Sequence, residues 1–351
     1  MQRFTASDIR RLEQFFAAAQ RVCIAVHTHP DGDALGSGAA LAQYLRRCRG
    51  KQAFLLLPDP PADALGFLLP AEGVLTASRD RADAEAALAG CDLLVCLDMN
   101  GFSRAGDLEA PLRSCPARRV LIDHHQHPDV ACFDLVFSEI QVSSASELLY
   151  TMLCSLPGVG EARKLPLEVL TPLMAGMTTD TNNFANSVFP STLRMASELL
   201  DAGVDRDALL DALYHRYREN RLRAMGWYLD TVRITPEGVA WSVLDRSASA
   251  RFGLEEGETE GFVNLPLGIG GVRLSVFLRE DDGYFRVSLR SKPGVSASRL
   301  AAESFHGGGH ECAAGGRLYF PQDIAAPADV ADYIETVTAR FMRNSAPSEN
   351  D

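Results

Sequence analysis

The stretch Val120-Leu121-Ile122-Asp123-His124-His125 decides how the chain is organised. A short apolar run ends here in three consecutive titratable residues, whose side chains are expensive to bury without partners. Together these three side chains make sense as ligands of a cation and as supports for such ligands. A surface loop with chance histidines would have the same composition, and the rest of the chain must separate the two interpretations.

Two more apolar runs end in acidic or imidazole residues: residues 22–26 before His27, Asp31 and Asp33, and residues 93–97 before Asp98. Apolar runs of strand length alternate with helical patterns in this half of the chain. The alternation predicts an α/β fold with a doubly wound, mostly parallel sheet and right-handed crossovers. Ligands bind outside the carboxyl ends of the strands in such sheets. We therefore expect the three strand ends to converge on one place.

The apolar periodicity predicts helices over residues 7–20, 34–47, 80–89, 144–156, 167–177, 192–202 and 207–217, and strands over 22–26, 54–57, 93–97 and 120–122. Ser144 and Glu147 have the spacing of a capping box at a helix start. After Pro236 the pattern changes to strands at 239–244, 273–278 and 285–289. We expect a first domain over residues 1–205, a helical linker over 206–225 and a second, smaller α/β domain over 226–345.

Composition limits the class of protein. The 351 residues are 46% hydrophobic and 23% charged, and the net charge of −12 (34 minus 46) disfavours long duplex nucleic acid. The eight cysteines form no C-x-x-C pair, which is typical of reduced thiols in a cytoplasmic protein. The N-terminus does not resemble a signal peptide, and no run of 18 uncharged apolar residues occurs, so we expect no membrane association.

The candidate metal ligands are four carboxylates and two imidazoles: His27, Asp31, Asp33, Asp98, His124 and Asp180. So many carboxylates cannot share a pocket in ionised form unless cations compensate their charge. Oxygen and nitrogen ligands without thiolates suit manganese or magnesium better than structural zinc. Six ligands with one shared carboxylate are enough for two metals, and a pair ~3.5–4 Å apart can hold both the attacking and the leaving oxygen at phosphorus.

These residues have a familiar order. His27-x-x-x-Asp31-x-Asp33, Asp98, Asp123-His124-His125 and Asp180 resemble the four motifs of the DHH phosphoesterases. Ser288-Leu289-Arg290-Ser291 and Gly307-Gly308-Gly309-His310 resemble motifs of the associated DHHA1 domain. The combination is most similar to the bacterial nano-RNase and pAp-phosphatase group, which is related to RecJ exonucleases, and the resemblance covers nearly the whole chain.

The resemblance implies a role for each metal ligand. One ion would be held by His27, Asp31 and Asp98, and the other by Asp33, Asp98, His124 and Asp180, with Asp98 as the bridge. Manganese is the expected ion, with magnesium as the alternative.

The resemblance also implies roles for residues that bind no metal. Asp123 would orient its neighbours, and His125 would face the scissile phosphate. Arg290 would bind a substrate phosphate, and backbone N–H groups of a turn formed by residues Gly307, Gly308, Gly309 and His310 would approach an anion. The chain departs from the family at His306, where a fourth glycine is frequent, and this bears on the shape of the phosphate site.

The expected function is degradation of very short single-stranded RNA and removal of the 3′-phosphate of 3′-phosphoadenosine 5′-phosphate (pAp). A manganese-dependent pyrophosphatase or exopolyphosphatase is the alternative, because it uses a similar first domain. A non-catalytic nucleotide sensor is a third hypothesis, although none of the six ligands is missing. The sequence leaves open whether the chain forms a homodimer.

Overall fold

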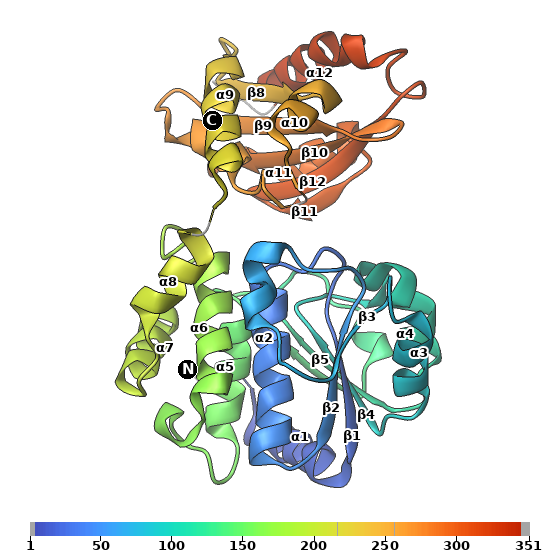
Figure 1. The fold of residues 1–351 in the computed structure, drawn as a ribbon, viewed down its shortest axis with the longest axis vertical. Helices are drawn as coiled ribbons and strands as arrows, with labels where there is room; N and C mark the ends of the chain where they lie inside the picture. Colours follow the sequence, from blue (N-terminus) through green and yellow to red (C-terminus); the bar gives the residue numbers. More distant parts are fainter. Residues whose placement is uncertain (1–3, 216, 256, 345–351) are drawn as a thin grey trace. The chain divides into compact units, whose positions relative to one another are not determined.

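The computed structural model describes residues 4–215, 217–255 and 257–344. The chain divides into two compact units, Met1–Arg216 and Tyr217–Asp351 (Figure 1). Helix α8 (Arg206–Tyr214) belongs to the first unit and helix α9 (Glu219–Thr231) to the second. Within the described ranges, none of the helices has the length and apolar character needed to span a bilayer.

The first unit contains a six-stranded sheet in the order β3-β2-β1-β4-β5-β6, with every neighbouring pair parallel. Its strands are β1 (Arg21–Ala25), β2 (Gln52–Leu57), β3 (Val74–Thr76), β4 (Leu93–Leu97), β5 (Arg118–Asp123) and β6 (Leu135–Ser138). The predicted α/β fold with a parallel sheet is confirmed. Because β4 lies between β1 and β5, the three strands that lead into the candidate ligands are neighbours at the centre of the sheet.

Helices cover both faces of this sheet, as a doubly wound fold requires. They are α1 (Ala6–Ala18), α2 (Gly32–Gln43), α3 (Arg81–Ala89), α4 (Glu109–Ser114), α5 (Ala145–Ser155), α6 (Leu167–Asp180), α7 (Pro190–Asp201) and α8. Alternate residues of β4 face opposite cores: Leu93 and Val95 pack with α1, α2 and α5 to α8, whereas Leu94 and Cys96 pack with α3 and α4. Figure 1 shows α3 and α4 on one side of the sheet and α2, α5 and α6 on the other.

Close packing of α2 against α6 depends on glycine. A Cβ atom at Gly36 would lie 2.4 Å from the carbonyl oxygen of Pro172, and one at Gly32 would lie 2.3 Å from Oγ1 of Thr179. Real side chains do not approach that closely, so the two helices can touch only because these positions have no side chain. The contact brings the start of α2, which carries Asp33, next to the end of α6.

Several boundaries differ from the prediction because local capping decides them. Helix α1 begins one residue before Ser7, because Thr5 and Asp8 form a reciprocal capping box. Helix α2 begins at Gly32 with Asp31 as its N-cap, and the chain continues after Gln43 as a π-helix, Tyr44–Cys48. Helix α6 continues past residue 177 to Asp180.

The second unit has a six-stranded mixed sheet in the order β11-β12-β10-β9-β8-β7, in which only β8 and β9 are parallel among the described pairs. Its strands are β7 (Arg233–Ile234), β8 (Val239–Leu244), β9 (Leu274–Glu280), β10 (Tyr284–Ser291), β11 (Gly308–His310) and β12 (Ala313–Tyr319). Helices α9 and α10 (Arg246–Phe252) pack on one face, whereas α11 (Ala297–Ser304) and α12 (Val330–Asn344) pack on the other. This is the predicted second α/β domain.

Short 3₁₀ segments complete the description: Asp63–Leu68, Phe102–Leu108, Val130–Cys132, Ala162–Lys164, Phe262–Gly268 and Pro327–Asp329.

Candidate metal centre

The loop after β1 holds the first two candidate ligands. His27 is buried, and its Nδ1 lies 2.8 Å from the carbonyl oxygen of Thr28. A proton on Nδ1 satisfies that oxygen and leaves Nε2 as the ligating atom, the usual arrangement at metal sites. Nε2 lies 3.4 Å from Oδ2 of Asp98 and 3.8 Å from Oδ1 of Asp31. Asp31 also caps α2, because its Oδ1 accepts hydrogen bonds from the amides of Asp33 and Ala34.

Asp98 follows β4 directly and lies at the centre of the cluster. It is 2% exposed, and its backbone is left-handed with φ +55°. That conformation is costly for a residue other than glycine and concentrates at functional sites. Its Oδ1 lies 3.3 Å from Nε2 of His124, yet this oxygen accepts no hydrogen bond of good geometry from any described residue. A buried carboxylate oxygen without a donor fits a cation ligand.

The residues after β5 divide into a ligand and a supported imidazole. Nε2 of His124 lies 3.3 Å from Asp98, 3.6 Å from Asp180 and 3.9 Å from Asp33. Nδ1 of His125 lies 2.7 Å from Oδ1 of the fully buried Asp123. Asp123 therefore orients His125 in particular, and this bond occupies the Nδ1 atom that a cation near Asp98 would need.

Asp33 and Asp180 complete the cluster from helices. Both carboxylate oxygens of Asp33 accept backbone hydrogen bonds from the first turn of α5: Oδ2 from Ala145 at 2.6 Å and Oδ1 from Ser146 at 2.9 Å. These amides have no partner inside their own helix, and the positive end of the helix favours a carboxylate. Asp180 is the last residue of α6.

The pKa shifts in the cluster indicate that it suits a bound cation. Burial and the charge of Asp98 raise the pKa of Asp33 to about 7, and burial and the charge of Asp33 raise the pKa of Asp180 well above its usual value. Burial opposes the charged forms of Asp98 and His124 as well. Their mutual attraction outweighs it, so the pKa of Asp98 falls well below its usual value and the pKa of His124 rises to about 10. Four crowded carboxylates are all ionised only when positive charge compensates them.

The six candidate ligands and His125 form overlapping groups that suit divalent cations. Three groups have ligand atoms within 4.8 Å of one another: His27, Asp31 and Asp98; Asp33, His124 and Asp180; and Asp98, His124 and His125. Their donors are oxygen and nitrogen only, which suits hard or borderline divalent ions. The first group is the set that the resemblance implies for one ion. The second contains three of the four residues that it implies for the other, and the fourth, Asp98, lies 3.3 Å from His124.

In the second unit, Arg290 is half-buried on β10, where its Nη1 donates to the carbonyl oxygen of Leu289 at 2.9 Å. Burial lowers the pKa of Arg290, and the charge of Glu260 opposes this effect. Arg290 pairs in register with Ala313 of β12, and Ala313 pairs with His310 of β11. Ser288, two residues before Arg290, pairs with Gly315 of β12, and Gly315 pairs with Gly308 of β11. Arg290 therefore lies on a sheet face whose neighbouring positions carry small residues.

The expected turn at residues 307–310 is wrong in form. Residues Gly308–His310 are the edge strand β11, paired with β12, and the bend of the hairpin comes after them. Gly307 and Gly309 are required by close approach, because a Cβ at either would lie within 2.5 Å of a β12 carbonyl oxygen. A Cβ at Gly308 would meet open space. An edge strand presents unpaired backbone groups, so approach to a ligand remains consistent with this geometry. The side chain of His310 lies outside the described residues.

His306, the departure from the family, is engaged elsewhere. Its backbone is left-handed with φ +46°, and its Nε2 lies 3.0 Å from Oδ1 of Asp323. This contact ties the entrance of β11 to the segment after β12.

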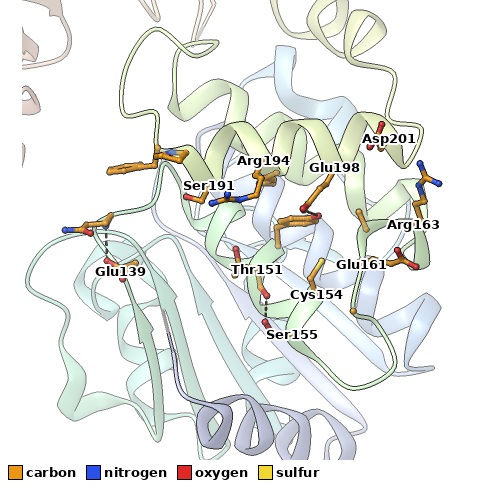
Figure 2. Close-up of a pocket in the computed structure, with 17 residues that line it drawn as sticks. Glu139, Thr151, Cys154, Ser155, Glu161, Arg163, Ser191, Arg194, Glu198 and Asp201 are labelled. Carbon is orange, nitrogen blue, oxygen red and sulfur yellow. Dashed lines mark hydrogen bonds between the residues drawn. The ribbon is translucent and has the colours of Figure 1, made fainter. Parts of the chain in front are cut away.

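A separate cavity of about 1230 Å³ lies between α5 and α7 (Figure 2), and none of the six candidate ligands lines it. Figure 2 shows Thr151 and Cys154 of α5 opposite Ser191, Arg194 and Glu198 of α7. The same two helices contain a feature that the sequence pattern indicated only as a cap. Ser144 accepts a hydrogen bond from the Glu147 amide as expected, but the Glu147 carboxylate reaches other partners, described below.

Both units of the chain are similar to known protein families. Residues 21–177 match the model of the DHH family, N-terminal domain, and residues 239–337 match the DHHA1 domain. The bifunctional oligoribonuclease and PAP phosphatase NrnA of Thermus thermophilus is 34% identical over 301 residues, which cover 85% of this chain and 84% of that protein. The chain belongs to the DHH family.

Two further relatives of this DHH-family chain agree with that membership. NrnA of Bacillus subtilis, which has the same description, is 29% identical over 297 residues, covering 84% of this chain and 88% of that protein. A crystal structure of an exopolyphosphatase-related protein from Bacteroides fragilis superposes with a TM-score of 0.91 and 30% identity, covering 98% of this chain and 99% of the other. The similarity therefore extends over both units.

Proposed function

We propose that this chain is a metal-dependent phosphoesterase that degrades very short oligoribonucleotides and removes the 3′-phosphate of pAp. The observation that carries the proposal is the convergence of His27, Asp98, His124 and three further carboxylates at the ends of three adjacent parallel strands. Relatives named as oligoribonucleases and PAP phosphatases match this chain over most of its length, which supports the substrate class.

The assigned ligands are His27, Asp31 and Asp98 for one divalent ion, and Asp33, Asp98, His124 and Asp180 for the other. Manganese is the proposed ion. When bound, such ions neutralise phosphate oxygens and supply a nucleophilic water at neutral pH. Asp98 belongs to both proposed sets of ligands and has a left-handed backbone conformation.

His125 acts on the substrate in this proposal. Its Nδ1 is held by Asp123, so the imidazole keeps one orientation and one tautomer. When the ring is protonated on both nitrogens, the opposite nitrogen, Nε2, can donate a hydrogen bond or a proton to the scissile phosphate group. In the second unit, Arg290 binds another phosphate of the substrate, and β11, which lies beyond β12 in the same sheet, offers exposed backbone groups.

An exopolyphosphatase is the second candidate, because the superposed protein from Bacteroides fragilis is described as exopolyphosphatase-related. Polyphosphate and pAp both offer phosphate groups to a metal centre, and they differ in the nucleoside. A non-catalytic nucleotide sensor would bind pAp without turning it over.

One panel of assays separates these functions. Purified protein with manganese is incubated with pAp, a ribodinucleotide, a 24-nucleotide RNA, pyrophosphate and polyphosphate, and products are followed by chromatography. We expect AMP from pAp and mononucleotides from the dinucleotide, with slow turnover of the 24-mer. Phosphate release from polyphosphate without turnover of pAp would support the exopolyphosphatase, and binding of pAp without products would support the sensor.

A further inference from the structure

Glu147 is a fully buried carboxylate in the first turn of α5. Its Oε2 accepts hydrogen bonds from the backbone amide of Ser143 at 3.0 Å, the hydroxyl of Ser143 at 2.7 Å and the hydroxyl of Thr192 at 2.6 Å. Burial raises the pKa of Glu147, but hydrogen bonds from Ser191, Thr192 and Ser143 outweigh it, so the pKa is lowered. Three donors on one oxygen exceed what a helix cap requires.

These bonds join the start of α5, whose amides hold Asp33, to the first turn of α7. Ser143 precedes α5, whereas Thr192 lies in the first turn of α7. The Thr192 hydroxyl also accepts a hydrogen bond from the backbone amide of Phe189. Residues 181–189 connect Asp180, the last residue of α6, to α7. Glu147 therefore fixes the start of α5 to the start of α7.

The start of α5 is also the support of Asp33. The amides of Ala145 and Ser146, two residues and one residue before Glu147, donate to the two oxygens of the Asp33 carboxylate. The packing there allows little movement, because a Cβ at Gly176 would lie 2.1 Å from Oγ of Ser146 and 2.8 Å from Oδ1 of Asp33. A shift of the first turn of α5 is thus a shift of the Asp33 carboxylate.

We propose that Glu147 is a positioning residue of the metal centre, which holds the first turn of α5 so that its amides orient Asp33 toward the ion. The inference rests on the proposed function only in taking Asp33 as a metal ligand. Supports behind a metal ligand contribute to affinity because they fix the direction of the ligand atom before the metal arrives.

The test is manganese binding to the full-length protein, measured by calorimetry on chelator-treated samples of wild type, Glu147→Ala, Glu147→Gln and Tyr150→Phe. Tyr150→Phe is the matched control. Tyr150→Phe also removes a hydrogen bond between α5 and α7, which the Tyr150 hydroxyl donates to Glu198 at 2.6 Å. Tyr150 lies one turn further along α5 than the amides that bind Asp33. Urea unfolding of each variant reports the structural cost separately.

We expect Glu147→Ala to raise the manganese dissociation constant on the order of 10–100-fold, which is the range for loss of a support behind a ligand. Tyr150→Phe should leave the dissociation constant unchanged. Glu147→Gln should recover part of the affinity, because its amide oxygen can accept from the same hydroxyl groups. If Glu147→Ala does not fold, Thr192→Val removes one donor at similar volume and should weaken manganese binding in the same direction.

Equal manganese affinities of Glu147→Ala and Tyr150→Phe would overturn the inference, as would wild-type affinity in Thr192→Val when Glu147→Ala does not fold. Failure of the metal-ligand assignment has a different signature, because the wild-type protein would then bind no manganese at all. Failure of the proposed activity is different again, because the wild-type protein would then bind manganese without releasing AMP from pAp.

Discussion

Asp98 is the residue that both proposed ions share. It lies 3.4 Å from His27 and 3.3 Å from His124, and it is buried at the end of β4. We expect Asp98→Ala to abolish turnover of pAp and to weaken manganese binding while the fold survives. Circular dichroism, calorimetry and a pAp assay check the three parts.

Asp92→Ala is the control for Asp98→Ala. Asp92 is an aspartate at the opposite end of the same sheet, directly before β4, where it accepts hydrogen bonds from the amides of Gln20 and Arg21 at the start of β1. Its replacement should leave both metal binding and turnover intact. Retained activity of Asp98→Ala at saturating manganese would contradict the assignment of a shared ligand.

His125 and His124 are adjacent in sequence and differ in their contacts. Because Asp123 holds Nδ1 of His125, we expect His125→Ala to lower kcat by roughly 10²–10⁴-fold, the range for a positioned acid or base. Metal content should stay near that of wild type, whereas His124→Ala should lose metal. Steady-state kinetics together with metal analysis check this division. A metal-free His125→Ala protein would show that His125 is itself a ligand.

The sequence could point to the candidate metal ligands because each follows a strand or helix that its apolar pattern makes visible. It could not reveal the contact of Asp33 with α5, since the bonded residues are 112 and 113 positions apart. The partner of Glu147 in α7 is likewise 45 residues away. The spacing of Ser144 and Glu147 predicted the helix start and the hydrogen bond from the Glu147 amide to the Ser144 hydroxyl. The partners of the Glu147 carboxylate are decided by tertiary packing instead.

At the scale of elements, the junction of α2, α5 and α6 is close-packed around Gly176. We expect Gly176→Ala to destabilise the protein by about 1–3 kcal/mol, the usual cost of overpacking, because the new methyl group meets Ser146 and Asp33. Gly226→Ala is the matched control: Gly226 lies in α9, and a Cβ there meets nothing within 4 Å. It should stabilise its helix by about 0.5–1 kcal/mol.

Urea unfolding followed by circular dichroism checks this pair of variants, with tryptophan fluorescence reporting on the second unit, which contains Trp227 and Trp241. Equal stability of Gly176→Ala and wild type would show that the junction can relax and that Asp33 is not held rigidly by this packing.

The glycine run illustrates where prediction of elements fails. Three consecutive glycines have turn propensity, and a local pattern contains nothing that opposes a turn. The strand β11 forms because β12 provides backbone partners, and Gly307 and Gly309 are needed for close approach to that strand rather than for a tight bend. By contrast, β4 and β8 have the predicted bounds, because continuous apolar runs mark buried strands clearly.

At the scale of the whole molecule, the second unit is expected to bind substrate without taking part in the bond cleavage. Arg290→Ala should therefore reduce kcat/KM for pAp and dinucleotides. The loss of transition-state stabilisation should be on the order of 2–5 kcal/mol, the cost of truncating a buried charge pair. A minimal activated phosphodiester, bis-p-nitrophenyl phosphate, should be turned over at nearly the wild-type rate.

The control for Arg290→Ala is Arg286→Ala, which removes an arginine four residues earlier on the same strand and the same face of the sheet. It should affect neither substrate. Equal losses on pAp and on the minimal substrate would mean that Arg290 serves the fold or the chemistry, and the substrate-binding role of the second unit would be withdrawn.

The measurement that tests the central claim most directly is a manganese titration of chelator-treated protein in which bound metal and AMP released from pAp are followed in the same samples. We predict no AMP before metal is added, and a rise in AMP formation as the centre fills to two ions per chain. Turnover of pAp that persists in excess chelator, or a chain that fills with manganese and releases no AMP, would contradict the account.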